Sequence, residues 1–343
     1  MELPLDLREA IEKAVSGEKP ERLKKVSQEI TRKYKNESGQ GRSLVSEKLD
    51  ASVYAAVRMP ATFGAVDDAL RYTLAYYHGS VRSVFDVGAG SGAATWAVDE
   101  VLDPDTIVCF EREKAMRQVG ISLMASRPSL LGKTEWLEMD LVKDGFADAF
   151  RRAESVGAEG AEEASKQADL VISSYVLNEL SGKDRILALE KLWAATSGAL
   201  LIVEPGTKEG FAVISQIRSY MLENVEKTGA YLIAPCPHDG PCGLDPEDWC
   251  HFTCRVQRSR LHKQLKEADV PYEDEKYAYI AFSRTPCEER AQARVLRHPY
   301  ITKGQIDLRL CVADAIQDKT VRKRDGELFK QAKKCKQGDS LAL

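Results

Sequence analysis

At 343 residues the chain has about twice the length of a typical domain, so it can bury a substantial core without disulfides or metal ions to stabilise it. Hydrophobic residues make up 43% of the chain and charged residues 30%, which excludes collagen-like, low-complexity and wholly disordered proteins. The net charge of −4 is unevenly distributed, because residues 251–343 contain 20 Lys and Arg but only 13 Asp and Glu. This excess of positive charge could bind a polyanion.

The amino-terminal region, residues 1–78, has the spacing of helices. Apolar residues recur every three or four positions in segments 7–15, 21–35 and 44–77, with charged residues between them. Pro60 is expected to divide the last segment into two helices, because proline removes a helical hydrogen bond. The first fifteen residues alternate acids with apolar residues and lack the features of a signal or transit peptide, so we expect a cytoplasmic protein of bacterial type.

Residues 79–229 have the pattern of a parallel sheet with crossover helices, because short apolar runs alternate with helical ones. No apolar run approaches the ~20 residues that cross a bilayer, so no membrane partner is expected. A solvated helix or loop is expected at 146–167 and a helix near 210–228. The expected strands are 83–87, 106–111, 135–139, 170–174 and 199–204.

The remaining chain divides into three parts. Residues 230–270 contain a loop rich in Pro, Gly and Cys and then a basic helix. Residues 271–318 contain two strand-like segments, 277–283 and 306–312, which are expected to complete the sheet. Residues 319–343 are rich in Lys and are expected to form a partly ordered basic tail. The predicted fold class is therefore α/β, a Rossmann-type sheet with a helical amino-terminal region and a cysteine-rich insertion that binds a metal.

A glycine-rich loop marks the end of the first expected strand. Its sequence, DVGAGSG, contains Asp86, Gly88, Gly90 and Gly92. Glycines permit a tight turn and close approach of a ligand, and the following helix offers free N–H groups. Glu111 ends the next strand, where a carboxylate can accept hydrogen bonds from ribose hydroxyls. This GxGxG pattern after an acidic strand end resembles the S-adenosylmethionine-binding loop of class I methyltransferases.

That resemblance implies a class I methyltransferase-like fold and assigns cofactor contacts. Residues 86–92 would line the methionine and ribose side of S-adenosylmethionine, Glu111 would hold the ribose, and Asp140, after the third strand, would lie near the adenine. A glycine-rich turn in an unrelated doubly wound fold is the alternative.

The sequence specifies catalysis less well. The fourth expected strand ends in SSYVLNEL, which places Tyr175, Asn178 and Glu179 at the sheet edge where substrates bind in such folds. Asn178 and Glu179 are the candidates for orienting a methyl acceptor. An equally good interpretation makes them the cap and first turn of the next helix.

A cluster of cysteines follows the expected sheet strands. Four of the eight cysteines fall within 19 residues, spaced C-x5-C-x7-C-x3-C; they are Cys236, Cys242, Cys250 and Cys254. Thiolates suit zinc and iron-sulfur clusters, and a loop dense in Pro and Gly has the backbone freedom to bring them together. Buried structural thiols are the alternative, and His238 and His251 would compete as ligands if the metal were zinc.

Three segments together resemble a known family. The glycine loop, the phrase WCHFTCRVQRSRLHKQLK at 249–266 and the stretch MPATFGAVDDAL at 59–70 are similar to the Rsm-type family of small-ribosomal-subunit assembly proteins, found in bacteria and, as methyltransferase-like factors, in mitochondria. The resemblance covers nearly the whole chain. It implies a 4Fe-4S cluster bound by three loop cysteines and one from the final strand. Those ligands map onto Cys236, Cys242, Cys250 and Cys311.

The spacing alone does not choose Cys311 over Cys254 as the fourth ligand, because Cys254 lies much closer in sequence to the other three. Only the resemblance makes that choice.

Five cations follow the cysteine loop within twelve residues, with no acid between them: Arg255, Arg258, Arg260, Lys263 and Lys266. As one stripe they would contact the phosphates of RNA. The alternative is an ordinary solvated helix face. Because no aromatic residues are interleaved, recognition of phosphate and shape is favoured over reading of bases.

Three hypotheses result. The first is an S-adenosylmethionine-binding, iron-sulfur protein that acts in small-subunit assembly or translation by binding ribosomal RNA or a pre-ribosomal particle, is a monomer off the ribosome, and transfers methyl groups weakly or not at all. The second is an active ribosomal RNA methyltransferase. The third is a zinc-containing methyltransferase of a small molecule with no RNA partner.

Overall fold

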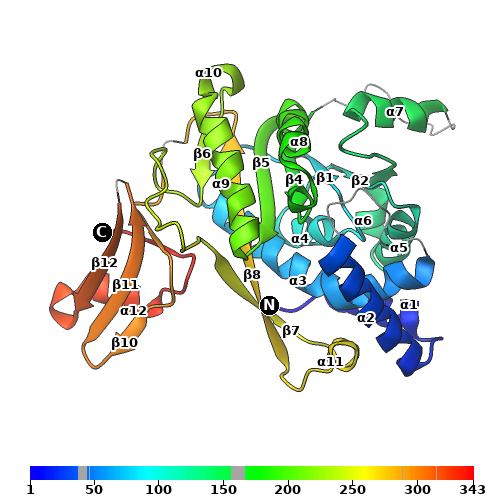
Figure 1. Ribbon diagram of the computed structural model, residues 1–343, viewed down its shortest axis with the longest axis horizontal. Coiled ribbons are helices and arrows are strands. Elements are labelled where there is room, and N and C mark those ends of the chain that lie inside the picture. The colour runs from blue at the N-terminus through cyan, green and yellow to red at the C-terminus, as the bar shows by residue number, and fades with distance from the viewer. Residues whose placement is uncertain (38–44, 46, 156–166, 288, 314) are drawn as a thin grey trace.

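The computed structural model describes residues 1–37, 45, 47–155, 167–287, 289–313 and 315–343 (Figure 1). A helical amino-terminal region packs against a large mixed sheet, and a second, smaller sheet lies at the carboxyl-terminal end of the chain. In Figure 1 the smaller sheet, coloured orange to red, stands to one side of the larger one.

The amino-terminal helices follow the predicted apolar spacing. They are α1 (Leu5–Val15), α2 (Pro20–Glu37) and α3 (Lys48–Leu74). The predicted break at Pro60 is wrong, because α3 continues through this residue. A proline inside a helix costs roughly 3 kcal/mol. Burial of 18 of the 27 residues of α3 offsets that cost, since the helix packs between α4, α5 and the larger sheet.

The larger sheet has the strand order β3-β2-β1-β4-β5-β8-β6, and β7 pairs with β8. Strands β1 to β5 are parallel, whereas β8 runs antiparallel between β5 and β6. This order, with one antiparallel strand next to the last position, is that of class I methyltransferases and confirms the predicted α/β fold. The strands are β1 (Ser83–Val87), β2 (Thr106–Phe110), β3 (Thr134–Leu137), β4 (Ala168–Ser174), β5 (Thr196–Pro205), β6 (Tyr231–Ala234), β7 (Phe252–Gln257) and β8 (Tyr272–Ser283).

Helices cover both faces of this sheet and build two apolar clusters. One cluster joins the α1, α3, α4 and α5 side chains to one face of β1, β2, β4 and β5, and the other joins α7, α8 and α9 to the opposite face. The expected solvated segment at 146–167 begins with α7, and its residues 156–166 lie outside the described part of the chain. The helices are α4 (Ala93–Val101), α5 (Lys114–Met124), α6 (Pro128–Gly132), α7 (Phe146–Ser155), α8 (Gly182–Ala194), α9 (Lys208–Glu223), α10 (Val225–Thr228) and α11 (Arg260–Lys266).

The carboxyl-terminal residues form a separate sheet, which corrects two predictions. Residues 306–312 do not complete the larger sheet but lie in β11, and residues 319–343 are not a tail but contain a strand, a 3-10 turn, a helix and a final short strand. The elements are β9 (Ala293–Val295), β10 (Tyr300–Thr302), β11 (Gln305–Val312), β12 (Ile316–Arg322), η2 (Lys323–Asp325), α12 (Glu327–Lys334) and β13 (Ser340–Leu341). These residues form a separate sheet because they build a small apolar core of their own. Ile306, Leu308 and Leu310 belong to this core together with Val321 and Ala332.

Among the described helices, none is long and apolar enough to cross a bilayer.

Candidate functional site

The carboxyl ends of β1 to β4 border a cavity of about 150 Å³, at the edge where doubly wound sheets bind ligands. Six of the residues singled out in the sequence line it: Gly88, Gly90, Glu111, Asp140, Tyr175 and Glu179. We call this the cofactor cavity. The parallel strands bring these residues together although they are spread over 92 positions of the chain.

Two glycines shape the loop after β1. Gly88 and Gly90 have φ values of 75° and 56°, which favour glycine. A β carbon at Gly88 would lie 2.3 Å from Cγ2 of Val176, whereas a β carbon at Gly90 would meet no atom within 4 Å. Gly88 therefore permits close packing of the loop, and Gly90 presents bare backbone to the cofactor cavity.

Glu111 is fixed at the end of β2 and is only 8% exposed. Its Oε2 accepts a hydrogen bond from the N–H of Gly90 at 2.9 Å, and its Oε1 accepts one from the N–H of Glu113 at 2.7 Å. Burial raises the pKa of Glu111, although these hydrogen bonds act in the opposite direction. Each oxygen retains a further lone pair, so the carboxylate can still accept from a ribose hydroxyl.

Two residues expected to line the cofactor lie outside the cavity lining. Asp86 is buried behind the loop, where its Oδ2 accepts hydrogen bonds from the Thr95 hydroxyl at 2.7 Å and the Thr95 N–H at 3.1 Å. Burial raises the pKa of Asp86 to about 6. Gly92 faces the side chains of Met124 and Trp136. Asp86 and Gly92 thus support the loop from behind.

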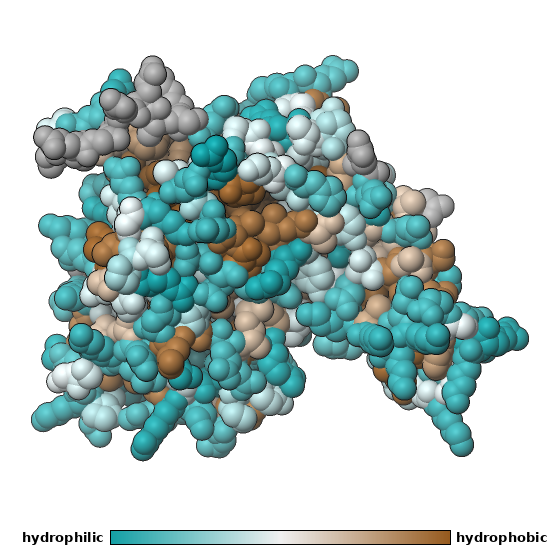
Figure 2. All heavy atoms as spheres, turned by 180° about the vertical axis from the view of Figure 1, so that it is seen from behind, coloured by the Kyte–Doolittle hydropathy of each residue, from teal (hydrophilic) through white to brown (hydrophobic). Residues whose placement is uncertain are grey.

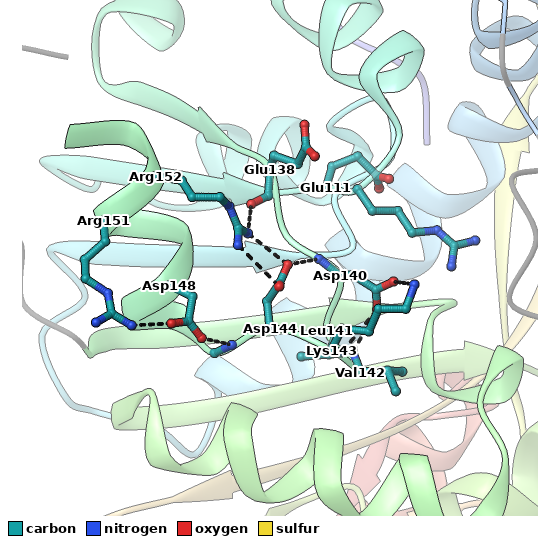
Figure 3. Close-up of polar contacts among 12 residues, drawn as sticks. Glu111, Glu138, Asp140, Leu141, Val142, Lys143, Asp144, Asp148, Arg151 and Arg152 are labelled. Atoms are coloured by element: carbon teal, nitrogen blue, oxygen red, sulfur yellow. Dashed lines mark hydrogen bonds and ion pairs between the residues drawn. The ribbon is translucent and has the colours of Figure 1, made fainter. Parts of the chain in front are cut away.

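Asp140 lies in a tight turn after β3. Figure 3 shows its side chain together with those of the neighbouring acidic and basic residues. Its Oδ1 accepts from the N–H groups of Val142 and Lys143, at 3.1 and 3.3 Å, and the Lys143 ammonium lies 3.1 Å from Oδ2. Burial acts to raise the pKa of Asp140, but the contacts with Lys143 outweigh it and lower the pKa. Asp144 and Arg152 hold the same turn from outside, because Asp144 accepts from the Asp140 N–H at 2.9 Å and from Arg152 at 2.8 Å.

Asn178 and Glu179 do not cap the following helix, so that alternative is wrong. They lie in a 3-10 turn, η1 (Leu177–Glu179), and α8 is capped later by the hydroxyl of Ser181. Asn178 is exposed, whereas burial raises the pKa of Glu179 to about 7 against the effect of nearby Arg112. Both residues border a second cavity, and Glu179 also lines the cofactor cavity.

Glu204, near the end of β5, is a buried carboxyl group that the sequence did not single out. It is 0% exposed, and its Oε1 accepts from the N–H of Leu177 at 2.8 Å, which anchors η1. Its Oε2 has no hydrogen-bond partner among the described residues. Burial raises the pKa of Glu204 to about 8.

We therefore expect Glu204→Gln to change how stability depends on pH. Because the pKa of Glu204 is raised on folding, the unfolded state loses the proton at a lower pH than the folded state does. The free energy of unfolding of the wild type should therefore fall by up to about 1.4 kcal/mol per pH unit between the ordinary pKa of a glutamate and about 8. Thermal unfolding at pH 5 and pH 8.5 should show a smaller loss in Glu204→Gln than in the wild type. The exposed control Glu226→Gln should behave as the wild type, and equal losses in all three proteins would refute a protonated Glu204.

Four cysteines from two distant parts of the chain line one small cavity of about 40 Å³. They are Cys236, Cys242, Cys250 and Cys311. The first three lie in the loop between β6 and β7, and Cys311 lies on β11 of the smaller sheet. Burial raises the pKa of Cys311 to about 12, and the charges of Cys236 and Cys242 add to this effect. We call these residues the four-cysteine cavity.

Cys254 lies elsewhere. It is buried on β7, and its Sγ is 3.2 Å from the position that a β carbon on Gly64 of α3 would take. The structure thus places Cys311, and not Cys254, with the three loop cysteines. Within the described ranges, no group of three or more His, Cys, Asp or Glu side chains is positioned to hold a metal ion.

Two buried arginines hold the cysteine loop. Arg218 of α9 donates to the carbonyl oxygens of His238 and Gly240, at 2.9 and 2.6 Å. Arg294 of β9 donates to the carbonyl oxygens of Pro235 and Gly338, at 3.0 and 2.8 Å. Each guanidinium keeps one buried nitrogen without a hydrogen-bond partner among the described residues, Nε of Arg218 and Nη2 of Arg294.

The five cations after the cysteine loop do not form one exposed stripe, which corrects the sequence interpretation. Arg255 lies on β7 and pairs with Asp274 at 2.7 Å, and the Lys266 ammonium donates to Glu273 at 2.6 Å. The reason is the acidic run at the start of β8, which pairs with β7. Arg258 is also largely covered, whereas Arg260 is exposed and Lys263 is half-buried on α11.

The tip of the smaller sheet offers a basic surface, and the sequence analysis placed two of its cations, Lys323 and Arg324, in a tail. Lys303, Lys323 and Arg324 are exposed there, and no ion pair is found for either lysine among the described residues. Beside them, the side chains of Tyr300 and Ile301 on β10 are 69% and 51% exposed. Figure 2 shows the smaller sheet as a projection with a mainly hydrophilic surface. We call these five residues the sheet tip.

Sequence reasoning missed the contribution of α3 to both cavities. Tyr54 and Thr62 line the cofactor cavity and its neighbour, and Met59 lines the cofactor cavity alone. Their spacing of three to five residues on one helix is indistinguishable from core packing, so no local signal could have identified them.

Solved structures with a similar fold include methyltransferases of low sequence identity. The magnesium protoporphyrin IX methyltransferase of Synechocystis with bound S-adenosylmethionine is 12% identical, with a TM-score of 0.40 over 76% of this chain and 97% of the other. The plantazolicin methyltransferase BpumL with bound S-adenosylhomocysteine is 12% identical, with a TM-score of 0.39 over 80% of this chain and 98% of the other. Both scores are low, so the fold assignment rests on the strand order.

Relatives were also found by sequence. Human "Ribosome assembly protein METTL17, mitochondrial" is 26% identical over 304 residues, which cover 85% of this chain and 62% of the human protein. "Rsm22-cox11 tandem protein 2, mitochondrial" of Schizosaccharomyces pombe is 27% identical over 217 residues, or 51% of this chain and 29% of the yeast protein. The chain thus spans less than two thirds of the length of these relatives.

The sequence prediction of a bacterial-type cytoplasmic location is wrong, because both of these relatives and the matching family are described as mitochondrial. The family match extends over residues 48–342, from the start of α3 to the end of the smaller sheet. The chain therefore belongs to the Rsm22 family, described as mitochondrial small ribosomal subunit Rsm22.

Proposed function

We propose that this protein binds S-adenosylmethionine and a 4Fe-4S cluster and acts in assembly of the small ribosomal subunit by contacting ribosomal RNA. Off the ribosome it is a monomer. The single observation that carries the proposal is the four-cysteine cavity, which joins the loop after β6 to the smaller sheet. Family membership and the name of the human relative, a ribosome assembly protein, support the ribosomal role.

The charge of the cofactor cavity supports S-adenosylmethionine, which carries a sulfonium and an ammonium group. Glu111, Asp140 and Glu179 line the cavity from three different strand ends. Buried carboxylates with raised pKa values cluster at functional sites, and here they would favour a cationic ligand. Gly90 and Glu111 would hold the ribose side, and Asp140 the adenine side.

The residues of the four-cysteine cavity fit an iron-sulfur cluster in three respects. Four thiols supply the usual ligand set of a 4Fe-4S cluster. The unpaired nitrogens of Arg218 and Arg294 and the unpaired hydroxyl of Tyr279 are buried donors around the thiols, and they lack an anionic acceptor among the described residues. A cluster with thiolate ligands would supply that acceptor and would fix the loop to β11.

The sheet tip supports contact with RNA. Exposed cations without acidic partners bind phosphates, and an exposed aromatic ring such as Tyr300 can stack on an unpaired base. An active ribosomal RNA methyltransferase is the second candidate function. It is favoured by Glu179, which borders both the cofactor cavity and its larger neighbour.

Salt-dependent binding tests the RNA contact. We expect reversing three charges of the sheet tip, with Lys303→Glu, Lys323→Glu and Arg324→Glu, to weaken binding to small-subunit ribosomal RNA. Each lost phosphate contact should flatten the slope of log affinity against log salt by ~0.7–0.9. Filter binding measures both effects. It is carried out from 50 to 300 mM salt, which is roughly the range over which such contacts are screened.

A matched control reverses three exposed charges on α7, α8 and α10: Arg151→Glu, Lys183→Glu and Lys227→Glu. Both triple variants change the net charge equally, so only a local contact makes them differ. Equal weakening in the two variants would contradict the proposed interface. Transfer of labelled methyl groups to the RNA would instead favour the active enzyme.

A further inference from the structure

A second cavity, of about 780 Å³, adjoins the cofactor cavity. It lies between α2, α3 and α11, and the two cavities share four lining residues: Tyr54, Thr62, Tyr175 and Glu179. Its volume is within the range of small-ligand sites. We call it the helix cavity.

The lining of the helix cavity includes an apolar wall and a polar rim. Ile30, Val53, Val57 and Leu265 form the apolar wall, and the aromatic rings of Tyr54 and Tyr175 lie beside it. The rim is formed by Gln28, Thr31 and Asn178. A planar group with hydrogen-bonding edges, such as a nucleobase, matches this combination of surfaces.

The helix cavity also has guanidinium donors that lack a hydrogen-bond partner among the described residues. Arg58 of α3 is largely buried, yet it makes no hydrogen bond or ion pair with any described residue. Arg258 is held by an ion pair between its Nη2 and Glu273 at 3.5 Å, but its buried Nε has no hydrogen-bond partner among the described residues. The lining acid Glu267 pairs with Lys24 outside, and Glu273 is occupied by Lys266 at 2.6 Å.

The backbone conformation of Tyr175 also indicates a binding site at the helix cavity. Tyr175 is one of two residues other than glycine with positive φ in the described chain, at 60°. Such a conformation is strained and persists where the surrounding structure requires it, often at binding sites. Here the Tyr175 hydroxyl donates to Glu275 at 2.9 Å, which fixes the ring at the junction of the two cavities.

We propose that the helix cavity binds a single unstacked nucleotide of RNA, with its phosphate on Arg58 and Arg258 and its base against the apolar wall. The Arg58 guanidinium, which makes no hydrogen bond or ion pair with a described residue, can bind phosphate well, because its fork geometry matches two phosphate oxygens, and Nε of Arg258 offers a further donor. Only the choice of RNA as the source of the nucleotide rests on the proposed function. A base beside Tyr54 and Tyr175 would lie next to the cofactor cavity, because both residues line the two cavities.

Titration calorimetry with the full chain tests this proposal, using cytidine and adenosine 5′-monophosphates as probes. We expect Arg58→Gln to weaken binding of at least one nucleotide about tenfold or more. Thr31→Trp, which places an indole at the rim without removing a buried group, should weaken it similarly. The control Arg260→Gln removes an exposed α11 cation that does not line the cavity and should bind as the wild type.

Four outcomes are decisive. Nucleotide binding that exceeds binding of the nucleoside and of inorganic phosphate, and that is lost in both cavity variants, supports the proposal. Absence of nucleotide binding in the wild type, or equal affinity in wild type, Arg58→Gln and Thr31→Trp with unchanged melting temperatures, overturns it. If nucleotides bind but ribosomal RNA does not, the cavity assignment stands and the proposed function fails. If ribosomal RNA binds but no nucleotide does, the proposed function stands and the cavity assignment fails.

Discussion

Replacing Cys311 by Ser is expected to abolish the brown iron-sulfur absorbance of anaerobically purified protein, with iron and sulfide falling to background. Cys311 is the one ligand candidate on the smaller sheet, so its loss would leave three thiols on a single loop. Because binding energy of a structural centre is also folding energy, the melting temperature should fall as well. Metal analysis, absorbance near 400 nm and thermal unfolding measure these effects.

Cys254→Ser is the matched control, since Cys254 is equally buried but lies against α3. It should retain iron and sulfide. Loss of the cluster in Cys254→Ser with retention in Cys311→Ser would show that the fourth ligand is misassigned. Zinc without sulfide in the wild type would favour the small-molecule methyltransferase with a zinc centre.

Replacing Gly90 by Val is expected to abolish measurable S-adenosylmethionine binding in calorimetry. The new β carbon would meet no protein atom within 4 Å, and the valine side chain would project from the loop that lines the cofactor cavity. Glu111→Ala should weaken binding less, by the ~0.5–1.5 kcal/mol of a hydrogen bond, or more if the bond is charged.

Gly229→Val controls for backbone strain in this experiment. Gly229 has a φ of 60°, close to the 56° of Gly90, and its β carbon would also meet nothing within 4 Å, but it lies after α10, away from the cavity. The two valine variants should therefore lose similar stability. Cofactor binding that is equal in Gly90→Val and Gly229→Val, or absent from the wild type, would contradict the cofactor site.

The larger sheet could be predicted because its signals are local. Each parallel strand is a short apolar run, and the predicted 83–87 coincides with β1 while the others agree with β2 to β5 within a few residues. The smaller sheet could not be assigned because β11 has the same alternation whether it joins one sheet or another. Only long-range pairing with β12 and β9 decides its place.

Sequence-based prediction of the candidate site has the same limit, because it cannot foresee contacts between distant parts of the chain. Motif spacing identified Gly90 and Glu111, and the resemblance to methyltransferases added Asp140; all three line one cavity. Motif spacing could not foresee that Glu273 and Asp274 would pair with the cations on β7 and α11, since that depends on strand pairing. Nor could it reveal Arg58, which only the fold shows to be largely buried without a hydrogen bond or ion pair to a described residue.

Arg294 links parts of the molecule that have separate apolar cores. From β9 it donates to the backbone at Pro235 and at Gly338, and its guanidinium lies 5.6 Å from the ring centroid of Tyr72 on α3. Removing the smaller sheet would therefore also strip support from the cysteine loop and from α3. We therefore expect the carboxyl-terminal fifty residues to unfold together with the rest of the chain, so that exchanging them for another module would cost stability elsewhere.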